Sequence, residues 1–174
     1  GWLTIGPQQQ PIDCNPHLVI GNGLDTHHFT ALHGMEMTGE PELTVDAPHR
    51  VQVTLQGRPE SSWLRWLTGT RNRPLRASFT TIGGHLAWTT VEQPVRFYVL
   101  FTGRPTPQGD TRTQVVFFLP RTLGPDLIRA VASMYVLLHD DRRILDHLDF
   151  TGSLTDQDRA LRAFETLVND LPRL

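Results

Sequence analysis

The sequence predicts an α+β domain in which an antiparallel β-sheet is followed by two helices. Two patterns support this fold class. Residues 76–120 are rich in β-branched and aromatic side chains, and after Gly124 the apolar residues recur with a period near 3.6. The length of 174 residues and the hydrophobic content of 39% suit one compact domain. We therefore expect a single domain over residues 1–174.

The first third of the chain combines extended and helical segments. Residues 1–21 contain three prolines and show no helical periodicity, so we expect them to be extended. Residues 22–35 are predicted to form a short helix that ends at Gly34. Polar and apolar residues alternate between positions 42 and 54, and Pro48 interrupts this strand pattern where we expect a turn.

The middle of the chain contains most of the predicted sheet. Residues 58–70 are expected to form one or two helical turns, capped by Ser61 or Ser62. Four strand-like segments follow, at residues 76–83, 85–92, 95–103 and 111–120. The glycine pair at 83–84 is typical of a tight hairpin. Short connections between these segments predict an antiparallel meander.

The last fifty or so residues have helical periodicity. A favourable helix start lies at residues 124–126, where a proline falls in the first turn and an acidic residue lies near the amino end. This helix is predicted to run toward Phe150 and to break at residues 151–153. A threonine–aspartate capping pattern then opens a final amphipathic helix over residues 155–170.

Composition excludes several classes of protein. The 16 basic and 18 acidic residues give a net charge of -2, which argues against a nucleic-acid-binding surface. One cysteine, Cys14, cannot form a disulfide framework or a four-thiolate metal site. No apolar run is long enough for a membrane span. We expect a cytoplasmic protein and, because the chain begins at Gly1, a fragment or a processed chain.

Residues 22–33 carry the first part of a predicted chemical site. Asp25 and His28 lie about 60° apart on an ideal helix, so the Asp25 carboxylate can reach the His28 ring and fix its tautomer. His28 and His33 lie roughly 140° apart, so a shared metal ion requires a distorted turn such as a π-bulge. The alternative is two polar histidines on an exposed helix end. His27 points away from His28 and is expected at the surface.

The long C-terminal helix supplies a candidate third ligand. Its apolar seam steps alternately by four and three residues, and the position that continues the seam is Asp141. The seam consists of Leu127, Val131, Met134, Leu138, Leu145 and Leu148. A carboxylate on an apolar stripe is costly unless a cation or hydrogen bonds meet it. Asp141 could instead pair with Arg142 or Arg143.

Two histidines and one carboxylate on one face of a metal ion are the ligand set of non-haem Fe(II) oxygenases. The remaining coordination positions stay open, which admits dioxygen. His28, His33 and Asp141 are therefore our candidate ligands for a mononuclear Fe(II).

The residues Asn22, Asp25, His28, His33 and Asp141 form one spaced pattern. This pattern resembles the catalytic domain of the Rieske non-haem iron oxygenase large (alpha) subunit, and the resemblance covers essentially the whole chain. It implies a helix-grip (START/Bet v 1-like) fold, with a long C-terminal helix packed over an antiparallel sheet. It also implies that both histidines and Asp141 bind iron, that Asp25 is the bridge for electron transfer, and that Asn22 lies beside this bridge.

The resemblance implies partners as well. A Rieske [2Fe-2S] cluster needs two cysteines and two histidines, which one cysteine cannot supply, so we expect a Rieske domain upstream of this chain. Electrons are expected from a ferredoxin or reductase, through the Rieske domain of the same or a neighbouring subunit in a homotrimer. The implied reaction uses dioxygen to hydroxylate or demethylate a small apolar substrate, aromatic or polycyclic. The chain alone is not expected to turn over.

Two other functions fit the same residues. A metal-free helix-grip module could bind a hydrophobic ligand between the sheet and the long helix. A zinc hydrolase could use the same three ligands, although Asp25 is better placed to orient His28 than to activate water.

Overall fold

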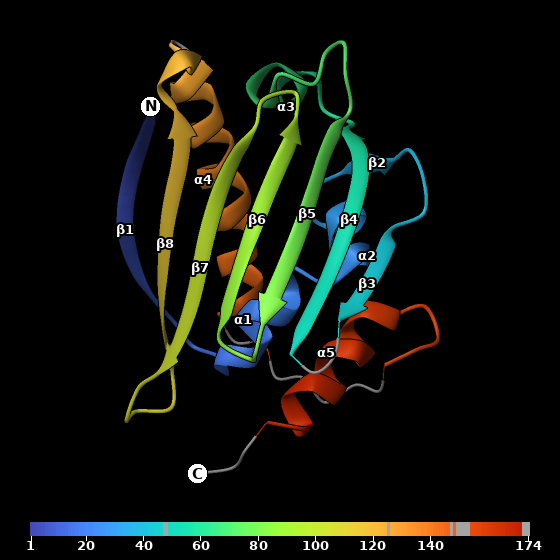
Figure 1. Cartoon of the computed structure of the whole chain (residues 1–174), viewed down its shortest axis with the longest axis vertical. Coiled ribbons are helices and arrows are strands. Elements are labelled where there is room, and N and C mark those ends of the chain that lie inside the picture. The colour runs from blue at the N-terminus through green and yellow to red at the C-terminus, as the bar shows by residue number, and fades with distance from the viewer. Residues whose placement is uncertain (47–48, 125, 147, 149–153, 172–174) are drawn as a thin grey trace.

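The computed structural model describes residues 1–46, 49–124, 126–146, 148 and 154–171. Within these residues, eight strands form one antiparallel sheet in the order β1-β8-β7-β6-β5-β4-β2, and β3 pairs with β4. Figure 1 shows α1, α2, α4 and α5 on one side of this sheet and α3 at one end. The predicted α+β helix-grip fold is confirmed, because α4 packs against the sheet through the apolar side chains of its inner face.

The strands lie within the first 120 residues, and the two longest helices follow them. The strands are β1 (Trp2–Ile12), β2 (Met35–Met37), β3 (Glu42–Asp46), β4 (Arg50–Pro59), β5 (Leu75–Ile82), β6 (Leu86–Gln93), β7 (Phe97–Pro105) and β8 (Thr111–Pro120). The helices are α1 (Pro16–Asn22), α2 (Thr26–Ala31), α3 (Ser62–Thr68), the 3-10 turn η1 (Arg121–Leu123), α4 (Asp126–Leu145) and α5 (Arg159–Asn169). The predicted meander is confirmed as β5 to β8.

The N-terminal segment differs from the prediction. Residues 2–12 are extended but belong to the sheet, since β1 pairs with β8 along its length. Residues 16–22 form a helix, so the expectation of an extended chain was wrong there. Pro16 occupies the first turn, where no amide donor is needed, and the side chain of Asn15 accepts a hydrogen bond from the amide of His17. Pro16, which the prolines of this segment predicted to be in extended chain, therefore starts a helix.

The C-terminal helices are shorter than predicted. α4 ends at Leu145, and Leu148, which the seam pattern includes, lies beyond the helix and is exposed. The final helix begins at Arg159 rather than at position 155. The predicted helix start at residues 124–126 agrees with the observed start of α4 at Asp126. The predicted turn at Pro48 and the predicted break at residues 151–153 lie outside the described residues. Among the residues that are described, no helix is long and apolar enough to cross a membrane.

The core lies between the sheet and the helices in two main clusters. In the first, Ile20 of α1 and Phe164 of α5 pack against Val53 of β4 and Phe79 of β5. In the second, the inner face of α4 covers side chains of β4 to β8 that include Phe117. Because apolar burial is the main favourable term in folding, these two clusters fix the positions of α1 and α4 on the sheet.

A smaller cluster of Ile12, Cys14 and Leu145 joins the end of β1 to the end of α4. Burial is the main reason that the pKa of the Cys14 thiol rises to about 11, and the nearby carboxylates of Asp146 and Asp13 add to the shift. The thiolate is therefore scarce at neutral pH, as expected of a structural cysteine.

The end of α1 provides a test of this packing. A Cβ atom on Gly23 would lie 2.2 Å from the Cε2 atom of Phe79, whose ring is buried in the first cluster. We expect Gly23→Ala to lower the free energy of unfolding by about 1–3 kcal/mol through overpacking. In Gly21→Ala the new Cβ meets Phe164 at 3.6 Å, an ordinary contact. This control should raise stability by up to about 1 kcal/mol, because alanine favours the helix. Urea denaturation measures both, and equal effects would contradict the prediction.

Candidate metal centre

The predicted ligands meet at one end of α4. His28 lies in α2, His33 follows it, and Asp141 lies in the last turns of α4. The Nε2 atoms of His33 and His28 lie 2.9 Å and 3.6 Å from the Oδ1 atom of Asp141. One possible ligand atom from each residue lies within 4.8 Å of the other two. The structure thus brings together all three residues that the sequence selected.

The turn after α2 explains how two histidines five residues apart share a site. The amides of Leu32 and His33 both donate to the carbonyl oxygen of His28, at 2.7 Å and 3.4 Å. The second bond spans five residues, which is the π-type closure that the spacing required. Gly34 has a φ of +55°, a left-handed conformation that favours glycine, but α2 already ends at Ala31. The predicted distortion is confirmed, whereas the predicted helix over residues 22–35 was too long at both ends.

Asp25 contacts His28 by a different route from the predicted one. The main-chain carbonyl of Asp25 accepts a hydrogen bond from Nδ1 of His28. The Asp25 carboxylate instead accepts from the amide of His27 at 2.9 Å and so caps α2. The expectation that the carboxylate orients His28 was wrong in this respect. The carbonyl has the same effect on the ring, because a proton held on Nδ1 leaves the Nε2 lone pair facing Asp141.

Burial sets the charge of the site. The side chains of His28, His33 and Asp141 are 9%, 1% and 18% exposed. Desolvation lowers the pKa of His28 below its usual value, and the Asp141 carboxylate only partly opposes that shift. His28 is therefore neutral near pH 7, which is the form that binds metals. The Nδ1 atom of His33 is buried without a hydrogen-bond partner among the described residues, so Nε2 makes this ring's polar contact.

The donor set and its spacing fit a metal ion. Two ligand atoms that each lie about 2.1 Å from one ion are separated by about 3.0–3.4 Å. The separations of 2.9 Å and 3.6 Å between the imidazole nitrogens and the carboxylate oxygen are close to this range. Two neutral imidazoles and one carboxylate suit a divalent ion such as Fe(II) or Zn(II).

Three further residues lie beside the candidate ligands in the sequence. Asn22 ends α1, lines the cavity described below, and accepts the Asp25 amide through its main-chain carbonyl at 3.3 Å. His27 is exposed, as expected. Sequence reasoning missed Phe29, whose ring centroid lies 4.1 Å from that of His28 and 5.9 Å from that of His33. Its place in the sequence between the two histidines was the signal that could have identified it.

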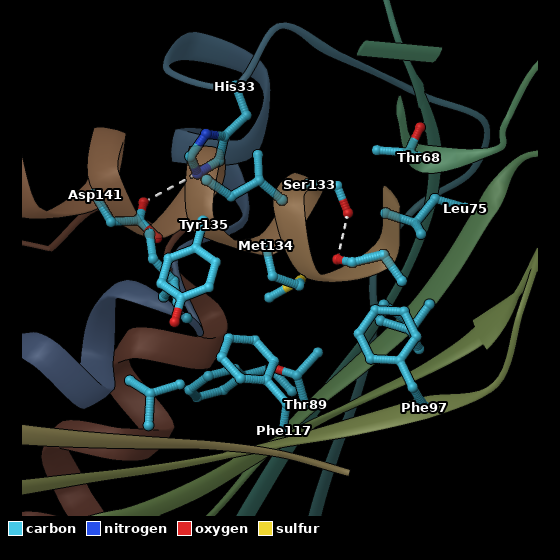
Figure 2. Close-up of a pocket in the computed structure, with 18 of the residues that line it drawn as sticks. His33, Thr68, Leu75, Thr89, Phe97, Phe117, Ser133, Met134, Tyr135 and Asp141 are labelled. Atoms are coloured by element: carbon cyan, nitrogen blue, oxygen red, sulfur yellow. Dashed lines mark hydrogen bonds and ion pairs between the residues drawn. The ribbon is translucent and has the colours of Figure 1, made fainter. Parts of the chain in front are cut away.

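A cavity of about 630 Å³ extends from the ligands between α4 and the sheet. Figure 2 shows His33 and Asp141 at one end and Thr68, Leu75 and Phe97 toward the other. The walls are mainly apolar, with Phe117 of β8 below and Met134 of α4 above. The candidate ligands therefore face a space that can hold a small apolar molecule.

The comparison with solved structures gives several close matches in fold. Dicamba monooxygenase bound to dicamba matches 95% of this chain and 57% of its own length, with a TM-score of 0.73 and 13% identity. NdmB of Pseudomonas putida CBB5 matches 94% of this chain and 48% of its own, with a TM-score of 0.68 and 13% identity. A quaternary ammonium Rieske monooxygenase matches 95% of this chain and 42% of its own length, with a TM-score of 0.64 and 8% identity. The chain has the fold of a Rieske oxygenase.

The predicted resemblance to Rieske non-haem iron oxygenases is thus confirmed at the level of the fold. No family model matches the sequence. No curated protein matches it either. The chain spans about half the length of these Rieske-fold neighbours.

The cap of α2 can be tested by substitution. Asp25→Ala removes the acceptor for the His27 amide, so we expect the free energy of unfolding to fall by about 1 kcal/mol. Asp25→Asn keeps an acceptor of the same size and should change the free energy of unfolding by about 0.3 kcal/mol at most. Guanidinium denaturation of both variants measures the difference. An equal loss in the two variants would show that the negative charge, rather than the cap, stabilises this segment.

Proposed function

We propose that this chain is the catalytic domain of a Rieske-type oxygenase. A mononuclear Fe(II) held by His28, His33 and Asp141 would activate dioxygen and oxidise a small apolar substrate, aromatic or polycyclic, by hydroxylation or demethylation. The observation that carries the proposal is the three-residue donor set opening onto an apolar cavity. An acidic side chain on the apolar face of α4 has a clear purpose if it binds a cation there.

Similar structures support the proposal. Dicamba monooxygenase has also been solved with non-haem iron and dicamba, and that structure matches 95% of this chain with a TM-score of 0.61. The neighbours act on chemically different molecules, since one binds dicamba and another is a quaternary ammonium monooxygenase. The fold is therefore compatible with several substrates, and the lining of the cavity decides which one this chain accepts.

A bound Fe(II) would supply the redox chemistry that dioxygen activation needs. The protein's own residues prepare the site for it. The Asp25 carbonyl holds the proton on Nδ1 of His28, which directs Nε2 toward Asp141. The ring of Phe29 packs against both imidazoles and limits their rotation. The apolar walls of the cavity keep water away from the reacting atoms.

Asp25 is our proposed entry point for electrons. Its main chain contacts His28 directly, and its side chain lies at the amino end of α2, partly accessible to solvent. A Rieske domain of the same or a neighbouring subunit would deliver electrons there, after reduction by a ferredoxin or reductase, in a homotrimer. Inter-subunit electron transfer has been described for the quaternary ammonium Rieske monooxygenase. Asn22 supports this segment through its contact with the Asp25 amide.

Metal binding tests the proposal. After anaerobic loading with Fe(II), the chain should hold close to one iron per molecule. Asp141→Ala should lower the affinity for Fe(II) by more than the 10–100-fold that is typical when an outer hydrogen-bond partner is lost, because a direct ligand is removed. The measurement is metal analysis after gel filtration, together with the electron paramagnetic resonance of the nitric oxide complex.

Asp140→Ala is the matched control. It removes the neighbouring carboxylate from the same helix but leaves the candidate ligands in place, so iron content should be unchanged. Iron that is absent from the wild-type chain would favour the metal-free ligand-binding module. A strong preference for Zn(II), accompanied by ester hydrolysis, would favour the hydrolase.

The role of Asp25 requires a separate test. Asp25→Asn keeps the main-chain carbonyl and a capping group, so iron content should stay near that of the wild type. Substrate oxidation in the assembly with its Rieske domain and reductase should fall at least about tenfold, as for other changes beside a metal ligand. Loss of iron together with activity would show that Asp25 shapes the site rather than carrying electrons to it.

A further inference from the structure

The cavity contains hydroxyl groups, and most of them are already used. Thr68 donates to the carbonyl of Leu64, Thr113 to that of Gln10, and Ser133 to that of Ala130. Ser78 lies opposite Thr90 and Thr54 and so projects from the other face of the sheet. These four residues add little polarity that a ligand in the cavity could use.

Two hydroxyls that line the cavity differ from the others. Those of Tyr135 and Thr89 have no hydrogen-bond partner among the described residues. Figure 2 shows the Tyr135 ring extending from α4 toward the sheet, with its hydroxyl at the far end, and Thr89 next to Phe117. An unpartnered hydroxyl on an apolar wall is available to a ligand that brings its own polar group.

Two observations place both groups over the same part of the sheet. The ring centroid of Tyr135 lies 5.7 Å from that of Phe117, a fully buried residue of β8. Thr89 pairs with Val99, which pairs with Phe117, so Thr89 lies in the same cross-strand row that Tyr135 covers. Val99 and Phe117 are apolar, so Thr89 supplies the free hydroxyl of this row.

We propose that Tyr135 and Thr89 bind a hydrogen-bond acceptor on the substrate, of the carbonyl type, and thereby select apolar ring compounds that carry one such group. This inference rests on the proposed oxygenase function and adds the substrate class. Tyrosine and threonine hydroxyls both donate, and a carbonyl oxygen has two lone pairs to accept. Both residues would position the substrate, since neither belongs to the candidate ligand set.

The geometry also predicts where oxidation takes place on such a substrate. Tyr135 and Asp141 are six residues apart, which is about 9 Å along the axis of α4. Six residues also turn an ideal helix by about 600°, so the two side chains leave α4 about 120° apart. The group that Tyr135 binds and the carbon nearest the candidate metal are therefore different parts of the substrate.

Binding of 9-fluorenone and fluorene to the metal-free chain tests the proposal. These probes have nearly the same shape, but only the ketone has an acceptor. Displacement of 1-anilinonaphthalene-8-sulfonate from the cavity measures both dissociation constants. We expect Tyr135→Phe and Thr89→Val each to reduce the preference for the ketone about fivefold, the typical effect of losing one neutral hydrogen bond.

Matched controls lie on the other face of the sheet. Tyr98 is the second tyrosine of the chain and packs against Trp2, and Thr90 is its cross-strand partner. Tyr98→Phe and Thr90→Val should leave the preference unchanged. A preference that is unchanged in Tyr135→Phe or in Thr89→Val overturns the role of that residue. A purely structural effect would weaken binding of both probes equally, and that result would also overturn the proposal.

The two proposals can fail independently. Probe binding is measured without metal, so absence of iron in the loading experiment would not alter its outcome. Conversely, a chain that binds iron but shows no preference for the ketone would retain its proposed oxygenase role and lose only the assigned substrate class.

Discussion

The contact between Asp141 and the two histidines determines how the rest of the site is organised. It joins residues that are 108 positions apart and ties the turn after α2 to the last turns of α4. Leu138 packs into the core one turn before Asp141 and Leu145 is buried one turn after it, so the helix cannot rotate the carboxylate away from the imidazoles. The cost of placing an acid on this face is offset only if polar partners or a cation meet it. The same contact closes one end of the cavity.

Much of this arrangement follows from sequence periodicity. Asp141 interrupts an apolar seam, and that pattern alone selects it from the neighbouring aspartates. The five-residue spacing of His28 and His33 requires a π-type closure, which the structure contains. Periodicity fails where one residue type has two structural uses. Pro16 starts a helix although prolines also mark extended chain, and Asp25 uses its carbonyl on His28 because its carboxylate is taken by the cap.

The cavity lining depends on information that local patterns do not contain. Alternation along β6 indicates that Thr89 and Thr90 face opposite sides, but only the pairing with β5 and β7 identifies which one faces α4. Tyr135 lies off the apolar seam and retains 37% exposure, so helical periodicity places it among solvent-facing residues. Its contact with Phe117 arises because the sheet continues beneath α4 as far as β8. Long-range packing therefore decides which polar groups a ligand meets.

One helix carries both the candidate metal ligand and the proposed polar anchor. Because α4 is regular between Tyr135 and Asp141, the helical rise holds their Cα atoms about 9 Å apart along the helix axis. Residues on loops would not fix this distance as well, since loops move more than packed helices. If the substrate is held by its acceptor group, the carbon presented to the metal is determined by the length of the molecule. A substrate of the wrong length would bind without placing a reactive carbon at the site, so selection here acts on position rather than on affinity alone.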